Sequence, residues 1–187
     1  MKKLLVVLAL AVLTAGPANA SVESLIYQEA LNTIVPMDLI NWKVGDTASY
    51  DVKISSFGKM GTNVKTVTKD EGTSIWLTQD LNLSGQKQLA EAQISKADGK
   101  ILKLIVNGKE QEIPNDPLEI ISQDYADVTV PAGTFQCIHV IAKSKQISKL
   151  EVWMNPRDTV MDGMIKQIAQ TQLFPLTMEL TSFKRMP

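Results

Sequence analysis

The sequence predicts a mainly β protein: a single large curved antiparallel sheet, or half-open barrel, of about 10–12 strands, with one N-terminal helix. Stretches in which apolar and polar residues alternate recur from Trp42 onward, as in strands with one buried face. Turn-forming residues separate these stretches about every ten residues, a spacing typical of hairpin-connected strands. The one convincing helical pattern lies before them, at residues 22–35.

Residues 1–20 have the pattern of a cleaved secretory signal peptide. Two lysines precede an apolar run at 4–13 that is too short to span a membrane, and Ala-Asn-Ala at 18–20 gives a small-x-small cleavage site. An uncleaved membrane anchor is the alternative. The stretch 13–16 resembles the approach to a lipobox, but Pro17 stands where the acylated cysteine belongs. We therefore expect a periplasmic protein without a lipid anchor.

Composition restricts the partners of the mature chain. Removing the leader leaves 187 − 20 = 167 residues, which fits one β-rich half-barrel domain at 21–187. Two of the 19 basic residues are lost with the leader, so the formal charge becomes 17 − 20 = −3. Nucleic acids require a concentrated basic surface, so we expect no nucleic-acid partner. No later apolar run is long enough for a transmembrane segment.

The helix predicted at 22–35 has apolar residues at three- and four-residue spacing. Ser21 is a suitable N-cap, and Pro36 ends the pattern. We expect this helix to pack on the sheet. A partner-binding arm is the alternative.

The clearest β signal is the stretch 127–143, which predicts a strand, a corner and a second strand. Val128 and Val130 alternate with polar residues, and Pro131 with Gly133 marks the corner. The range 118–125 before it is ambiguous between a short helix and a strand. Further strands are expected at 47–55, 62–68, 73–83, 88–95, 100–106, 109–113, 148–154, 164–171 and 174–185.

A sheet with this many strands exposes a broad apolar face unless it curls, and one short helix covers little of a concave face. The interior of such a half-barrel suits an elongated apolar ligand. Methionines adapt to varied apolar partners, although most fill gaps in cores. The tryptophans on two strands either line the concave side or cover a second layer. The expected cavity-lining residues are Trp76, Phe135, Ile141, Trp153, Met154, Met164 and Met178.

Several motifs occur in a fixed order: Trp42-Lys-Val-Gly-Asp46 with Tyr50, the corner at 128–135, Trp153-Met-Asn-Pro156, and the stretch 161–166. In this order they resemble bacterial exported domains of unknown function that are similar to the lipoprotein-carrier (LolA/LolB-like) half-barrel superfamily. The resemblance implies a curved antiparallel sheet in a periplasmic or outer-membrane-facing protein. It also implies, for some members, binding of lipid or lipoprotein acyl chains. It brings no catalytic motif.

Cys137 and His139 are the only cysteine and histidine, and they lie on the same side of one strand. They could form a nucleophile and its base, or offer two metal ligands. The alternative is that both are structural residues of a strand, because the sequence has no acid to orient the histidine and no third metal ligand at a suitable spacing. We therefore expect no metal, no cofactor and no catalytic residue.

Arg157 is one of two arginines and is followed by Asp158 in a predicted turn. It could bind an anionic group, or it could form a local solvated pair with its neighbour. From the sequence as a whole we expect a periplasmic, non-enzymatic binding or carrier protein for a lipid, an acyl chain or another amphipathic ligand. An interaction module that binds an envelope protein is the alternative, and a Cys/His-dependent enzyme is the least favoured function.

Overall fold

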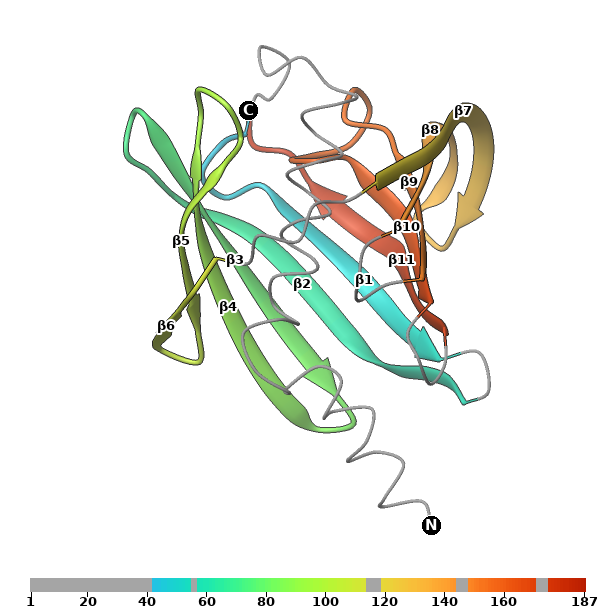
Figure 1. Ribbon diagram of the computed structural model, residues 1–187, viewed down its shortest axis with the longest axis horizontal. Coiled ribbons are helices and arrows are strands. Elements are labelled where there is room, and N and C mark those ends of the chain that lie inside the picture. Colours follow the sequence, from blue (N-terminus) through green and yellow to red (C-terminus); the bar gives the residue numbers. More distant parts are fainter. Residues whose placement is uncertain (1–41, 55–56, 114–118, 144–147, 171–174) are drawn as a thin grey trace.

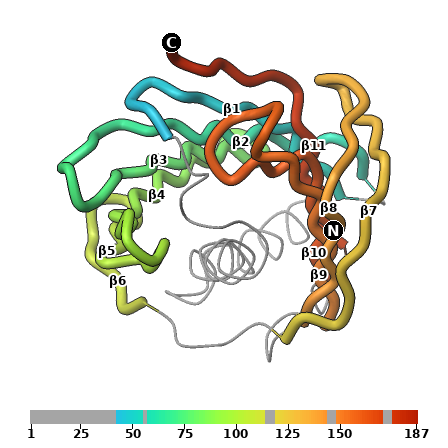
Figure 2. The backbone as a smooth tube through the Cα atoms, turned by 90° about the horizontal axis from the view of Figure 1, so that it is seen from above, coloured from blue at the N-terminus to red at the C-terminus, as the bar shows by residue number. Residues whose placement is uncertain are grey.

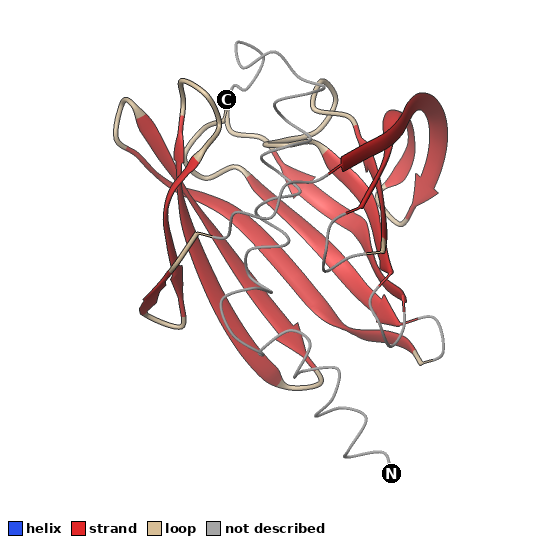
Figure 3. Ribbon diagram, viewed as in Figure 1, coloured by secondary structure: helices blue, strands red, loops and turns tan. Residues whose placement is uncertain are grey.

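The computed structural model describes residues 42–54, 57–113, 119–143, 148–170 and 175–187, and their regular structure is entirely β (Figure 3). The predicted leader at 1–20 and helix at 22–35 lie outside these residues. The strands are β1 (Thr47–Ile54), β2 (Gly58–Asp70), β3 (Ser74–Leu83), β4 (Gln86–Ser95), β5 (Ile101–Val106), β6 (Lys109–Gln111), β7 (Glu119–Val130), β8 (Gly133–Lys143), β9 (Lys149–Met154), β10 (Met164–Gln170) and β11 (Pro175–Lys184).

All eleven strands form one antiparallel sheet in the order β6-β5-β4-β3-β2-β1-β11-β10-β9-β8-β7. The predicted single antiparallel sheet is built from two meanders, β1–β6 and β7–β11, which join where β1 pairs with β11 along its full length (Figure 1). β6 and β7 follow each other in the chain but lie at opposite edges. The ambiguous range before the corner is a strand, β7. Among the described residues, no helix is long and apolar enough to cross a membrane.

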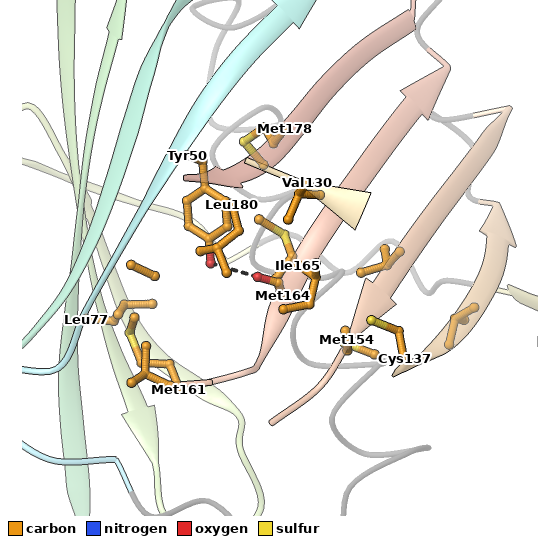
Figure 4. Packing of buried hydrophobic residues seen from close by; sticks show 14 of the residues in the cluster. Tyr50, Leu77, Val130, Cys137, Met154, Met161, Met164, Ile165, Met178 and Leu180 are labelled. Carbon is orange, nitrogen blue, oxygen red and sulfur yellow. Dashed lines mark hydrogen bonds between the residues drawn. The ribbon is translucent and has the colours of Figure 1, made fainter. Parts of the chain in front are cut away.

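The sheet curls into an open half-barrel (Figure 2). Contacts over intervening strands identify its concave face. The Tyr50 hydroxyl on β1 donates to the Met164 carbonyl on β10 over β11 (3.2 Å; Figure 4). Asn63 Nδ2 on β2 donates to the Met178 sulfur on β11 over β1 (3.6 Å). Such contacts bridge non-neighbouring strands because the sheet bends toward this side. The concave face is therefore the one with the alternating buried positions of β1, from Ala48 to Ile54.

The corner between β7 and β8 reaches back to the middle of the sheet. Beyond the Lys166–Glu179 pair, β10 no longer pairs with β11. There the Ala132 amide donates to the Leu180 carbonyl (3.1 Å). Buried Val130 lies near Leu180 in the core (Figure 4). The Pro-Ala-Gly corner predicted from the sequence thus also occupies the space that β10 leaves beside β11.

The convex face carries a polar row instead of a second core. The row contains one residue from each of six neighbouring strands, and each residue is the cross-strand partner of the next. Their side chains therefore point to the same side of the sheet. Lys53 Nζ and Lys166 Nζ lie 2.5 and 2.9 Å from the Glu179 carboxylate. The row consists of Asp124, His139, Trp153, Lys166, Glu179 and Asp51.

Candidate binding cavity at one end of the half-barrel

A cavity of about 430 Å³ lies where the chain enters β1, where β9 ends and where the chain leaves β11. Its apolar floor runs from buried Met154 on β9 through half-buried Ile138 on β8 to Tyr125 on the edge strand β7, which is 79% exposed. These three are consecutive cross-strand partners, and Met154 pairs in turn with Met164 on β10. The Met164 sulfur lies 3.9 Å from Lys65 Nζ of β2, on the concave side of the sheet. The cavity floor therefore belongs to the concave face.

Trp42 closes the cavity from the N-terminal side. The residue is 7% exposed, and its indole Nε1 is a buried donor without a hydrogen-bond partner in the described structure. A tight turn holds it in place: the Asp46 carboxylate accepts from the Lys43 amide (3.0 Å) and from the Met186 amide (2.8 Å). The motif at 42–46 therefore ties the start of β1 to the end of the chain beside the cavity.

The opposite wall is the connection between β9 and β10, residues 155–163, which we call the rim loop. Asn155 organises it: its Nδ2 donates to the Asp158 carboxylate (2.7 Å), and its Oδ1 accepts from the Asp158 amide (3.0 Å). Arg185 donates to the carbonyls of Arg157 (3.1 Å) and Thr159, so the last strand is also tied to this loop. The rim loop is thus held by bonds within itself, from Asn155, and by bonds from the end of the chain, at Arg185.

Gly163 closes the rim loop with a left-handed backbone, φ 71°. A Cβ at this position would lie 2.2 Å from the Pro156 nitrogen, which no side chain tolerates. This close approach brings Val160 and Met161 into the core, where both are 4% exposed. Figure 4 shows Met161, which also lines the cavity, beside Leu77 of β3.

The rim loop also brings a carboxylate to a buried lysine. Asp162 Oδ2 lies 3.6 Å from Lys65 Nζ, and the two side chains are 2% and 0% exposed. The Lys65 ammonium also lies over the Tyr50 ring, 5.1 Å from its centroid. A buried charge costs several kcal/mol unless it is paired, so this pair fixes the loop against the concave face of β2.

The cavity rim carries more positive than negative charge. Lys43, Arg157 and Arg185 line it together with one acid, Asp158, giving a formal sum of 3 − 1 = +2. The Asp158 carboxylate is bound by the Asn155 amide, and its predicted pair with Arg157 does not form. Within the described residues, Lys43 and Arg157 have no carboxylate within ion-pair distance.

Cys137 lines the cavity, but burial and the nearby Asp127 carboxylate raise its pKa to about 11. Its Sγ–H points to the Phe135 carbonyl (3.6 Å). His139 is engaged elsewhere, because its Nδ1 lies 3.0 Å from Asp124 Oδ1 and its ring stacks on Trp153 at 4.4 Å. In the described part of the chain, no three His, Cys, Asp or Glu side chains are grouped to hold a metal ion.

The residues expected to line a cavity are divided between the two faces. Met154 lines the cavity, and Met164 and Met178 lie on the concave face in the core. Phe135 is half-buried and packs against the same core from the corner. The other three lie on the convex face: Trp153 with its partner His139, Ile141 two residues along β8, and Trp76 opposite buried Leu77.

Sequence reasoning did not identify Trp42, Tyr125 or Ile138 as parts of a site. Trp42 did belong to one of the motifs that carry the family resemblance, at 42–46, and this was the one signal that could have pointed to it. Tyr125 and Ile138 belong together because of the β7–β8 register, which the alternation of apolar residues alone does not determine.

The sequence matches no protein-family model, and it matches no curated protein. Solved structures similar to this fold include a hypothetical protein from Chlamydia trachomatis, with a TM-score of 0.51 and 11% identity over 80% of this chain and 90% of that one. A candidate exported protein with a YmcC-like fold from Bacteroides fragilis gives 0.46 and 11%, over 78% and 98%. A candidate lipoprotein from Parabacteroides distasonis gives 0.39 and 10%, over 78% and 98%. At these identities the Chlamydia likeness concerns the fold alone, and the link to the lipoprotein-carrier superfamily stays a prediction.

Proposed function

We propose that this protein is a periplasmic, non-enzymatic binding or carrier protein for an amphipathic ligand, such as a lipid or an acyl chain. The observation that carries the proposal is the cavity on the concave face, with its floor of Tyr125, Ile138 and Met154. Its volume of about 430 Å³ lies within the range of small-molecule sites, about 300–1,000 Å³. The leader pattern at 1–20 supports the location.

The chemistry of the lining supports binding without catalysis. The floor is aliphatic, aromatic and thioether in character, and Met154 and Met161 can adapt to ligands of different shape. The one thiol, Cys137, stays protonated at neutral pH because its pKa is raised to about 11. A site of this kind offers a ligand apolar contact at its floor and polar contact at its rim.

Native mass spectrometry of the protein from its own periplasm, followed by organic extraction, tests the proposal. We expect a reproducible excess mass that extracts as an amphipathic compound. If the purified protein carries no bound compound, it would be incubated with decanol and, separately, with decanoate. Binding of neither compound would refute the proposal.

A matched pair of variants on β8 then locates the ligand. Ile138→Trp fills the cavity and should abolish loading, whereas Ile141→Trp lies on the convex face and should leave it unchanged. Both positions are half-buried, so the two variants place similar demands on folding. Equal loading of the two variants would show that the ligand does not occupy this cavity.

A second candidate function is binding of an envelope protein, and the edge strand β7 favours it. β7 has twelve residues and pairs with β8 as its one neighbour among the described strands. Ile121 and Tyr125 on it are 55% and 79% exposed. Exposed edges bind extended segments of partner proteins by strand addition. A photo-crosslinker at exposed Gln123 should then capture one defined envelope protein in living cells, and recovery of uncrosslinked protein alone would exclude this function.

A further inference from the structure

We infer that the ligand carries an anionic head group, a carboxylate or a phosphate, which is bound at the cavity rim by Lys43 and Arg157. This inference rests on the proposed function and specifies its substrate class. It starts from the contrast between an apolar floor and a rim whose formal charge is +2.

The rim charges are available because they have no partners of their own. In the described residues, neither the Lys43 ammonium nor the Arg157 guanidinium has a carboxylate within ion-pair distance, although most lysines on the strands are paired. Lys53, Lys59 and Lys166, for example, lie 2.5, 2.6 and 2.9 Å from carboxylate oxygens. The two unpaired cations thus both line this cavity.

The remaining charged groups of the rim are already bound. Arg185 is occupied with carbonyl groups of the rim loop. Asp158 accepts from the Asn155 side chain, and Asp46 below the rim accepts from two backbone amides. These bonds orient the two carboxylates toward amide groups, and within the described residues neither carboxylate forms an ion pair with Lys43 or Arg157.

A buried donor points to the same class of ligand. Trp42 lines the cavity, is 7% exposed, and has no acceptor for its indole Nε1 among the described residues. A buried donor without an acceptor is unfavourable, and a ligand oxygen that reaches it would satisfy it. Carboxylate and phosphate oxygens can accept from an indole N–H and from a guanidinium together.

The whole chain has a formal charge of −1, so the cationic rim is a local feature. A net positive charge at the mouth of a cavity attracts ligands of the opposite sign. An anionic head group at the rim would place its chain along the Tyr125–Ile138–Met154 floor. This orientation accounts for both parts of the lining with one amphipathic molecule.

Four probes with the same ten-carbon chain test the inference, used below their micelle-forming concentrations: decanoate, decyl phosphate, decanol and decyltrimethylammonium. We expect the two anions to bind at least about tenfold more tightly than decanol, and the cation to bind most weakly. The preference should shrink as salt is raised from 20 to 500 mM, which shortens the Debye length about fivefold, because the rim is exposed. The ratio of decanoate to decyl phosphate affinity distinguishes a carboxylate from a phosphate ligand.

Arg157→Gln and Lys43→Gln should each reduce the affinity for the anions about tenfold and leave the affinity for decanol unchanged. Lys87→Gln is the control, because Lys87 is exposed on β4, outside the cavity, and its loss changes the net charge equally. Arg157 and Lys43 lie outside the buried core, so both variants should retain the far-ultraviolet spectrum of the wild type.

Two patterns of failure have different meanings. Equal binding of all four probes, or equal effects of Arg157→Gln and Lys87→Gln, would overturn the anionic head group and leave the apolar cavity standing. No binding of any probe, decanol included, would overturn both the inference and the proposed function.

Discussion

Lys65 Nζ lies 3.6 Å from Asp162 Oδ2, although the two residues belong to strand β2 and to the rim loop before β10. Two strands, β1 and β11, separate β2 from β10 in the sheet. The pair meets because the sheet curls, and both side chains are almost fully buried. It therefore connects the curvature of the half-barrel to the loop that bounds the cavity.

Breaking this pair should destabilise the protein strongly. Lys65→Met leaves the Asp162 carboxylate buried without its cation, and Asp162→Asn leaves the ammonium without its anion. We expect each to lower the free energy of unfolding by about 3 kcal/mol or more, measured by urea denaturation. The double variant Lys65→Met/Asp162→Asn should lose less than the sum of the single losses. Additive losses would show that the two groups do not interact.

The rim loop depends on glycine at position 163. Gly163→Ala places a Cβ 2.2 Å from the Pro156 nitrogen and should displace the loop, with loss of decanoate binding and about 3 kcal/mol of stability. Gly72→Ala is the control: its φ is also positive, at 83°, but nothing lies within 4 Å of the added Cβ. That variant should lose about 1 kcal/mol and keep its binding. Similar losses in the two variants would mean that the close approach to Pro156 is unimportant.

The Cys137 thiol should react slowly at neutral pH. Burial raises its pKa to about 11 from an ordinary value of 9.0, so the thiolate fraction is small until the solution is strongly alkaline. The rate of alkylation by iodoacetamide should rise about tenfold per pH unit between pH 7 and 10. Urea-unfolded protein serves as the control and should react with an ordinary thiol profile. A rate at pH 7 that matches the unfolded protein would contradict the raised pKa.

Glu179 should make stability depend on acid pH. Burial raises the pKa of this carboxyl, but hydrogen bonds from Lys53 and Lys166 outweigh burial and hold the pKa below its ordinary 4.5. The stabilisation is therefore present above pH 4.5 and is lost as the pH falls through the lower folded-state pKa. At pH 7 we expect Glu179→Gln to be less stable than wild type by about 1 kcal/mol, with the gap closing in acid.

The control for this experiment is Glu112→Gln. Glu112 is exposed and has no cation within ion-pair distance among the described residues, so this variant should show no stability gap at either pH. The unfolding free energies of the three proteins are to be compared at pH 7 and pH 3.5. A Glu179→Gln gap that persists unchanged at pH 3.5 would show that the carboxylate charge is not its source.

The sequence determined the strands of this protein by local physics. Alternating apolar residues, as in Ala48 to Ile54, predict one buried face, and Pro131 with Gly133 restricts the backbone to a corner. The sequence also predicts that Trp76 and Trp153 point away from the main aliphatic faces of their strands, because successive side chains on a strand alternate between its two faces. These features need no knowledge of distant residues.

Tertiary structure alone decided which face is concave, where β1 meets β11, and where the cavity lies. Registers between strands far apart in sequence bring Tyr125, Ile138 and Met154 together, and curvature brings Lys65 to Asp162. The alternation of apolar and polar residues looks the same whichever face is concave, so it does not predict the direction in which the sheet bends. The bend comes from the sum of twist and close packing over eleven strands, a property that no single stretch of the sequence contains.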